Sequence, residues 1–406
     1  MNVLFLSLNR FEDLEVRHIY TDLMREFIRK GHYVYMTCCV PEDRVSFHSH
    51  LVRHEGYEVL KISTLPIVKT NAVKKGIGML LLEPQFGRAI RRHWGDVRFD
   101  LVIYATPPIT FNRVIARIAR RTGAHKYLLL KDIFPQNAVD LGMMREGSLI
   151  HRFFRRKERR LYRLSDRIGC MSPANCRYVI EHNTEVDAAK VELAPNSNEP
   201  IAERHVDAAE RAEVLKRLGI PADRRLFIYG GNLGKPQGLD FLLRVIAENE
   251  SSAENYILVI GSGTEYPRIE RWFAENSPRS ACLRKYIPKA DYDALLAVCD
   301  VGLIFLDRRF TIPNFPSRLL SYLENSMPVL LATDVNTDMG SIAEEAGFGL
   351  WAENGDLERF MANMRSLTAE NIAEMGAKGR QFLLDNYTVD RVTDTILRGL
   401  PAPLHH

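Results

Sequence analysis

Short apolar runs alternate with amphipathic helical patterns along the chain, and this alternation limits the possible folds strongly. The first half contains runs such as VLFLSL (3–8) and LVIYA (101–105), and LVIYA is followed by the helical pattern FNRVIARIARR. Strands separated by helices in this way build a parallel sheet that is covered on both faces. The sequence therefore predicts an α/β fold of the doubly wound type, with ligands beyond the carboxyl ends of the strands.

A polar, weakly periodic segment near residues 196–210 interrupts the alternation, which resumes at LFIYG (226–230). A chain of 406 residues is also longer than a single core normally serves. We therefore expect two Rossmann-like domains that face a central cleft. The expected parts are an N-terminal domain (1–200), a C-terminal domain (201–385) and a final helix (386–404) that crosses back to the first domain.

The two halves of the chain differ in charge. Residues 1–200 contain 32 Lys and Arg against 22 Asp and Glu, whereas the remainder contains 23 against 29. A basic first half indicates an anionic partner, for which nucleic acid, a phospholipid surface and a diphosphate-bearing substrate all qualify. Charge alone does not choose among these three.

The N-terminus and the cysteines favour a cytoplasmic protein. The opening MNVLFLSLNRFED lacks a basic n-region and is expected to form a first strand, not a signal peptide. No apolar stretch approaches the roughly 18 residues that span a bilayer. The six cysteines show no CxxC pair and no metal-ligand spacing, so we expect reduced thiols and no metal site.

The glycine-rich segment YGGNLGKPQG (229–238) follows a buried strand and is a candidate phosphate site. It is not a nucleoside-triphosphate loop, because Gly230 and Gly234 enclose three residues and Pro236 stands where the magnesium-binding hydroxyl would be. Glycines allow the backbone to approach an anion, the next helix offers its N-terminal amides, and Lys235 adds a positive charge. A tight turn without a ligand is the alternative.

Two further turns favour a ligand. Gly261 and Gly263 follow the strand YILVI, and in NFPSRLLSYLENS a helix begins near Pro316. Ser317 can cap that helix, and Arg318 in its first turn is a fork-shaped donor. Three such turns at one edge of a sheet predict a nucleotide-diphosphate pocket.

These motifs resemble those of retaining glycosyltransferases of family 4, which have the GT-B fold. The resemblance also involves IYTDLMREFIRKGHYVY, YATPPITF, LLLKDIFPQNAVDLGM, RIGCMSPAN, APNSNEP and YIPKADYDALLAVCDVGLIFL. Within the family the chain is most similar to the WbuB-like group of proposed N-acetyl-L-fucosamine transferases of O-antigen and capsule assembly. The resemblance implies transfer of a sugar from a UDP-sugar to a polyprenyl-diphosphate-linked saccharide, without a metal or other cofactor.

The resemblance also implies a set of donor contacts. Many relatives carry an Arg and a Lys in the diphosphate turn, where this chain has Asn232 and Gln237, so the positive charge falls to Lys235 and Arg318. The segment YIP (286–288) matches the part of the family that lies along the nucleobase. The implied donor-binding residues are Gly231, Asn232, Gly234, Gln237, Gly238, Gly261, Gly263, Tyr286, Ile287, Pro288, Asn314, Phe315, Ser317, Ser321 and Glu324.

Two glutamates that the family separates by seven residues are missing here. Their positions hold Pro313 and Ser321, so the recognition of the ribose hydroxyls must differ. Glu324, one helical turn further on, is a candidate substitute, and a solvated surface charge is the alternative.

The first domain is expected to bind the acceptor. Lys131 and Asp132 stand where many relatives carry a His-Asp pair, and they could bind sugar hydroxyls and steady charge, or form a structural ion pair. With Arg318 and Lys235 they complete the implied catalytic set. The implied acceptor-binding residues are Asp13, Arg17, Thr106, Gln136 and Asn137.

The segment HRFFRRKERRLYRLSDR (151–167) is strongly basic and carries an apolar stripe, and KTNAVKKGIGMLLLEPQFGRAIRRHW repeats the theme. Such a helix either lies in an anionic membrane interface or packs its stripe on the sheet. We therefore expect a peripheral contact with the anionic inner membrane as one of the two outcomes. The stripe consists of Ile150, Phe153, Phe154, Leu161 and Leu164.

Two other classes of protein were weighed. A nucleotide-sugar epimerase of the same architecture would need carboxylates and a histidine facing the donor, and the missing glutamates count against it. A nucleic-acid-binding protein would use the basic helix but would leave the three phosphate-type turns unexplained, so no nucleic-acid partner is expected.

Overall fold

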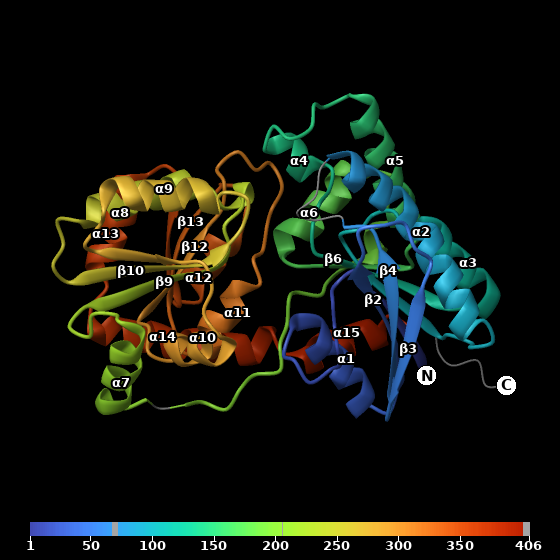
Figure 1. Cartoon of the computed structure of the whole chain (residues 1–406), viewed down its shortest axis with the longest axis horizontal. Helices are drawn as coiled ribbons and strands as arrows, with labels where there is room; N and C mark the ends of the chain where they lie inside the picture. Colours follow the sequence, from blue (N-terminus) through green and yellow to red (C-terminus); the bar gives the residue numbers. More distant parts are fainter. Residues whose placement is uncertain (67–71, 205, 401–406) are drawn as a thin grey trace. The chain divides into compact units, whose positions relative to one another are not determined.

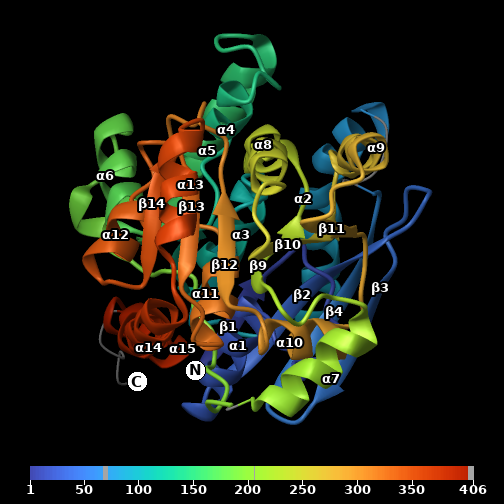
Figure 2. The same cartoon turned by 90° about the vertical axis from the view of Figure 1, so that its left-hand side faces the viewer.

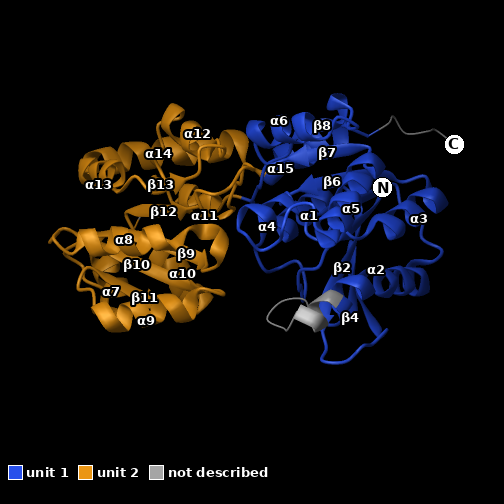
Figure 3. Cartoon of the chain, turned by 90° about the horizontal axis from the view of Figure 1, so that it is seen from above, with its two compact units in different colours: residues 1–199, 389–406 blue, residues 200–388 orange. Residues whose placement is uncertain are grey.

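The computed structural model describes residues 1–66, 72–204 and 206–400 and shows an α/β protein with two parallel-sheet units (Figures 1 and 3). Unit 1 contains Met1–Glu199 and the C-terminal segment from Val389 on, and unit 2 is Pro200–Thr388. The chain therefore passes from one unit to the other twice. In the described ranges, no helix has the length and apolar character needed to cross a membrane.

Unit 1 is built on an eight-stranded sheet in the order β3-β4-β2-β1-β5-β6-β7-β8. The central strands are buried apolar runs because helices cover both faces of the sheet. Its strands are β1 (Asn2–Leu6), β2 (Tyr33–Pro41), β3 (Ser49–His54), β4 (Tyr57–Thr64), β5 (Leu101–Ala105), β6 (His125–Leu130), β7 (Arg167–Cys170) and β8 (Val191–Leu193).

The expected parallel sheet of unit 1 carries one antiparallel edge strand, because β3 pairs with β4 in the antiparallel sense. The two strands are joined by a tight turn in which Gly56 has a φ of +79°. An edge strand has one open side and needs no continuous apolar run, so the polar sequence SHLVRH gave no strand signal.

The last helix belongs to unit 1. Its hydrophobic face, with Val392 and Ile396, lies in the same core as β1 and α1. The backbone N–H of Val389 donates to the carbonyl of Asn198 (3.1 Å), and Lys30 reaches two carboxylates of this helix. The helices of unit 1 are α1 (Ile19–Arg29), α2 (Ala72–Trp94), α3 (Asn112–Thr122), α4 (Gln136–Asp140), α5 (Leu149–Leu164), α6 (Pro173–His182), the 3₁₀ turn Ala188–Lys190 and α15 (Val389–Arg398).

Unit 2 has a six-stranded parallel sheet in the order β11-β10-β9-β12-β13-β14, and Figure 2 shows these strands in a row. The strands are β9 (Arg225–Asn232), β10 (Asn255–Ser262), β11 (Ala281–Arg284), β12 (Val301–Phe305), β13 (Val329–Thr333) and β14 (Gly349–Glu353). The helices are α7 (Ala208–Leu218), the 3₁₀ turn Lys235–Gln237, α8 (Leu239–Asn249), α9 (Tyr266–Asn276), α10 (Lys289–Leu296), α11 (Arg318–Glu324), α12 (Met339–Glu345), α13 (Leu357–Ser366) and α14 (Ala369–Asn386).

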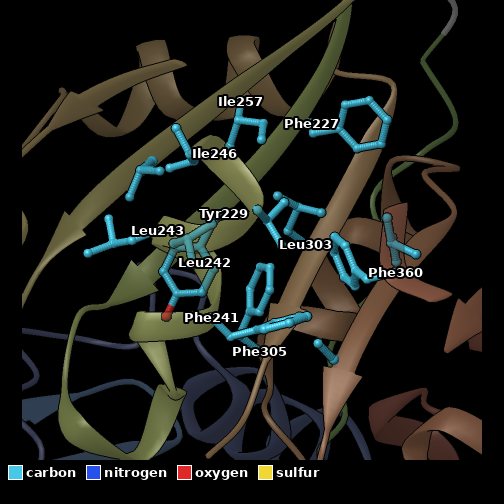
Figure 4. Close-up of a cluster of buried hydrophobic side chains, with 14 of the residues drawn as sticks. Phe227, Tyr229, Phe241, Leu242, Leu243, Ile246, Ile257, Leu303, Phe305 and Phe360 are labelled. Carbon is cyan, nitrogen blue, oxygen red and sulfur yellow. The ribbon is translucent and has the colours of Figure 1, made fainter. Parts of the chain in front are cut away.

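An aromatic cluster fixes α8 against the sheet of unit 2 (Figure 4). Phe241 of α8 lies with its ring centroid 6.1 Å from that of Phe305 on β12 and 5.5 Å from that of Phe360 on α13. Chain order reverses across the neighbours β9 and β12, so the crevice beyond their carboxyl ends is the topological switch point of this unit. In unit 1 the corresponding reversal lies between β1 and β5.

Candidate active site

The glycine turn of unit 2 begins later than its sequence indicates. We expected the strand to end at Tyr229, but β9 continues through two glycines to Asn232 and pairs there with the end of β10. Gly231 has a φ of +124°, and a Cβ atom on Gly261 would lie only 1.8 Å from the carbonyl oxygen of Gly231. Glycine is therefore required at Gly261 because β9 and β10 approach each other closely there. Glycine also leaves the backbone at this strand end without a side chain that would hold a ligand away from it.

The segment after β9 presents backbone amides at the switch point. Tyr229 donates its hydroxyl to the carbonyl of Asn232 (2.7 Å), which holds the turn against the strand end. Helix α8 then starts after Gly238, which has a φ of +56°, and its first turn has no side-chain cap. Lys235 in the preceding 3₁₀ turn is exposed. Uncapped helix amides with a nearby ammonium group are suited to an anion.

Arg318 joins the loops that follow β9 and β12. Its Nη2 donates to Oε1 of Gln237 (2.6 Å), and its guanidinium carbon lies 4.5 Å from the ring centroid of Tyr229. Its Nη1 is buried and has no hydrogen-bond partner among the described residues, and no carboxylate there forms an ion pair with Arg318. A buried N–H of a cation that has no partner is unfavourable, so the guanidinium is electrostatically suited to an anionic ligand.

Two more tyrosines surround this arginine and were missed by the sequence analysis. The hydroxyl of Tyr322 on α11 accepts from the N–H of Gly230 (3.1 Å) and donates to the carbonyl of Ile228 (3.1 Å). A Cβ atom on Gly230 would lie 2.0 Å from the hydroxyl oxygen of Tyr292, and burial raises the pKa of Tyr292 to about 12. In the sequence, both tyrosines have the pattern of ordinary core aromatic residues. Their contacts with β9 join segments that are far apart in the chain, so no local pattern indicates them.

The loop between β12 and α11, which precedes Arg318, is hydrogen-bonded to the segment after β13. Thr337 accepts from the backbone N–H of Asn314 (3.1 Å) and donates its hydroxyl to Oδ2 of Asp334 (2.9 Å). Asn336 donates its side-chain amide to the carbonyl of Phe310 (2.7 Å). Burial raises the pKa of Asp334 to about 6. Asn314 therefore anchors the loop through its backbone.

Several expected donor ligands have other surroundings in the structure. Phe315 is buried with its ring 5.9 Å from that of Tyr387, and Ser317 is exposed and makes no side-chain cap hydrogen bond, contrary to expectation. Ser321 is half-buried one turn after Arg318. These residues shape the loop and the first turn of α11.

Glu324 is not the solvated surface charge that was one of the two roles expected for it. It lies at the C-terminal end of α11, two turns from Arg318, and its side chain is buried. Its Oε1 accepts from the backbone N–H of Ile201 (2.9 Å), where the chain enters unit 2. The carboxylate therefore binds the backbone at the start of unit 2, and its role as a donor contact stays a prediction.

The expected nucleobase segment follows β11. Tyr286 is 79% exposed, whereas Ile287 is half-buried and Pro288 is the residue before α10. An exposed aromatic ring beyond the carboxyl end of a strand can stack on a planar base.

In unit 1, Lys131 and Asp132 lie beyond the carboxyl end of β6, but they do not pair with each other. Lys131 donates Nζ to the carbonyl of Ala194 (3.1 Å), and Oδ1 of Asp132 accepts from the side-chain amide of Asn137 (2.7 Å). The hydroxyl oxygen of Thr106 accepts from the backbone N–H of both residues at 3.0 Å. The alternative prediction, a structural ion pair between Lys131 and Asp132, is therefore wrong.

Burial moves the pKa values of both ionisable groups toward neutral pH. It lowers the pKa of Lys131 to about 7 and raises the pKa of Asp132 to about 6. Burial and the nearby charge of Asp132 also raise the pKa of Tyr20 on α1. The side-chain oxygen of Asn137 is buried without a partner in the described part of the chain, which suits a hydroxyl-bearing ligand.

The remaining expected acceptor contacts have hydrogen-bond partners within unit 1. Oδ1 of Asp13 accepts from the N–H of Glu15 (2.9 Å), and the guanidinium of Arg17 binds the carbonyl of Glu199. Gln136 donates its side-chain amide to Asp140 (2.8 Å). Their role in acceptor binding stays a prediction.

Replacing Lys131 by Met should change how stability depends on pH. An unfolded lysine has its pKa near 10.5, so above pH 7 the unfolded wild-type chain binds more protons than the folded chain, and its free energy of unfolding rises with pH. Relative to Lys131→Met, we expect the wild type to gain about 2 kcal/mol between about pH 7 and pH 9. Denaturant unfolding of both proteins at the two pH values measures this.

Asp132→Asn provides the control of opposite sign. Because the folded carboxyl keeps its proton up to about pH 6, the wild type should lose stability relative to this variant as pH rises from about 4 to 6. Parallel pH profiles for the wild type and Lys131→Met would contradict a buried, nearly neutral lysine.

The comparisons with known proteins agree on the class of enzyme. Residues 16–197 match the Glycosyl transferase 4-like domain. WbjE of Pseudomonas aeruginosa, named as a glycosyltransferase, is 25% identical over 72% of each chain. WcaI of Escherichia coli (strain K12), named as a colanic acid biosynthesis glycosyl transferase, is 22% identical over 71% of this chain and 70% of its own. The chain is a glycosyltransferase.

Solved structures identify the fold of this glycosyltransferase as GT-B. Sucrose-phosphate synthase from Thermosynechococcus elongatus has a TM-score of 0.75 at 14% identity and covers 98% of this chain and 97% of its own. HepE from Anabaena, in complex with UDP, has a TM-score of 0.64 at 13% identity and covers 98% and 99%.

Proposed function

We propose that this glycosyltransferase moves a sugar from a UDP-sugar to a polyprenyl-diphosphate-linked saccharide in the assembly of a bacterial surface polysaccharide. The observation that carries the proposal is the guanidinium of Arg318 at the switch point of unit 2, whose buried Nη1 has no partner among the described residues and which forms no ion pair there. The UDP in HepE and the assignment of WcaI to colanic acid synthesis support the donor and the pathway class. The resemblance to the WbuB-like group favours an N-acetylhexosamine donor, such as N-acetyl-fucosamine.

In the proposed mechanism the protein neutralises the leaving diphosphate. As the glycosidic C–O bond breaks, the electron pair passes to the diphosphate, and Arg318, Lys235 and the amides after β9 stabilise the added charge. The acceptor hydroxyl attacks from the face that the diphosphate leaves, so the anomeric configuration is retained, and its proton passes to the departing phosphate oxygen. No metal or cofactor is assigned a role.

In unit 1 we assign acceptor binding to the end of β6. Lys131, with a pKa of about 7, and Asp132, with a pKa of about 6, can both exchange hydrogen bonds with sugar hydroxyls. Thr106 fixes their backbone, and Asn137 orients the carboxylate.

UDP should raise the thermal unfolding midpoint, and GDP should not. Tyr286→Ala should weaken UDP binding about tenfold by removing the stacking surface, whereas Tyr286→Phe should keep it. Binding measured by calorimetry, with and without a chelator, tests the base contact and the absence of a metal requirement. Preference for GDP, or equal binding by the Ala and Phe variants, would contradict the assignment.

Transfer itself is tested with UDP-N-acetylhexosamines and polyprenyl-diphosphate-linked saccharides. Mass spectrometry should detect an acceptor larger by one residue, and NMR should show the anomeric configuration of the donor. Epimerisation of the donor without any acceptor would show that the second class of enzyme considered above is correct.

A further inference from the structure

The exposed side of α5 combines large apolar side chains at its N-terminal end with a row of arginines along its length. At its first turn Leu149 is 82% exposed, Ile150 is 62% exposed and Phe153 is 42% exposed. Met143, in the turn before the helix, is 60% exposed. The helix starts sharply here because the hydroxyl of Ser148 caps it. These four residues form an apolar tip at the N-terminal end of α5.

An arginine face continues from the apolar tip along the helix. Its members recur at intervals of three or four residues, so they share one side of α5, and all are exposed. None of them forms an ion pair with another described residue, whereas the ion pairs of this helix involve Arg155, Lys157 and Arg159. The arginine face consists of Arg152, Arg156, Arg160 and Arg163.

The structure thereby divides the apolar stripe seen in the sequence. Its C-terminal part packs on unit 1, since Leu161 and the adjacent Tyr162 are buried, and only its N-terminal part is exposed. Lys157, in the middle of α5, lies with its Nζ 5.7 Å from the ring centroid of Phe153 and 4.0 Å from Oε2 of Glu83 on α2. Ile77 and Leu80 of α2 are also exposed. The packing on unit 1 that was one of the two expected outcomes is therefore confirmed for the C-terminal part of the stripe only.

We infer that the apolar tip and the arginine face of α5 together dock unit 1 onto a membrane surface that contains anionic phospholipid. The arginines of this face form no ion pair with described residues, and their positive charge is complementary to lipid phosphates. The side chains of the tip can enter the boundary between headgroups and acyl chains. A nucleic acid would use the arginines but would leave the exposed Leu, Ile and Met without a partner. The inference deepens the proposed function, because a polyprenyl-linked acceptor is presented at such a surface.

Vesicle binding tests the inference without any transfer reaction. The full chain should co-sediment with vesicles of phosphatidylcholine and phosphatidylglycerol, more weakly at high salt, and little with phosphatidylcholine alone. Arg156→Gln/Arg160→Gln should weaken binding about thirtyfold, and Leu149→Ser/Ile150→Ser about tenfold.

Matched controls lie in unit 2. Arg271→Gln/Arg279→Gln removes two exposed arginines there, and Leu384→Ser removes an exposed leucine of α14; neither should alter vesicle binding. Circular dichroism and UDP binding, which uses unit 2, show whether each variant is folded.

Three results would overturn the inference: wild-type protein that ignores anionic vesicles, tip and arginine variants that bind like the wild type, or controls that weaken binding equally. A Leu149→Ser/Ile150→Ser variant that turns a dimer into a monomer in sedimentation would show that a second copy covers the tip instead. If vesicle binding behaves as expected but no donor is used, only the proposed function fails.

Discussion

Arg318→Met should raise the unfolding midpoint of the ligand-free protein and remove most of its affinity for UDP. The two effects have opposite signs because the same buried guanidinium, without a carboxylate partner, is unfavourable in the empty crevice and favourable beside a diphosphate. We expect a gain of about 1 kcal/mol in the free energy of unfolding and a loss of about 100-fold or more in UDP affinity and in kcat/KM. The hydroxyl of Tyr229 still donates to the carbonyl of Asn232 (2.7 Å) in this variant, so the substitution keeps that contact of the turn.

Calorimetry with UDP and thermal unfolding without it measure the two effects separately. Arg271→Met on the outer side of α9 is the matched control, because that arginine is exposed, and it should change neither quantity much. UDP affinity of Arg318→Met within about twofold of the wild type would remove the basis of the diphosphate assignment.

Gly261→Ala should be the most destabilising small substitution in the candidate site. The new methyl carbon would lie 1.8 Å from the carbonyl oxygen of Gly231, and a backbone atom within a paired strand cannot move aside without breaking the ladder. We expect a loss of about 3 kcal/mol in the free energy of unfolding and the loss of UDP binding with it.

Gly234→Ala, in the same turn, is the comparison that isolates this clash. Its φ of −114° suits alanine, and the nearest atom to the new Cβ is the side-chain amide of Asn232 at 2.9 Å, which can rotate away. We expect a change of about 1 kcal/mol or less. Denaturant unfolding followed by circular dichroism compares the two variants, and equal losses of stability would show that the strand contact does not set the requirement for glycine.

Much of the fold could be predicted from local pattern. The run LVIYA corresponds to β5 residue for residue, and the helical pattern FNRVIARIARR that follows it corresponds to α3 (Asn112–Thr122). Strong apolar runs in central strands are recognisable because both of their faces must be buried. The edge strand β3 has no such requirement, so its pattern was too weak to recognise.

The candidate site was less predictable than the fold. The glycine turns were assigned to the correct strands, although β9 continues past Tyr229 to Asn232. The hydrogen-bond partner of Arg318 could not be predicted, because Gln237 lies 81 residues away in sequence. Glu324 lies near the expected ligands in sequence, yet it binds the backbone of Ile201, 123 residues away. Contacts over such separations depend on which strands become neighbours, and a linear pattern does not encode that.

The sequence by itself determined the alternation of strands and helices, the positions of the glycines at the strand ends and the surplus of positive charge in the first half. Tertiary structure alone decided that Arg318 is buried without an anion, that Lys131 and Asp132 do not pair, and that α5 buries one end of its stripe and exposes the other. The physical reason is that hydrophobic periodicity is a local property. Burial, hydrogen-bond partners and the pKa values that follow from them are set by segments that meet only after folding.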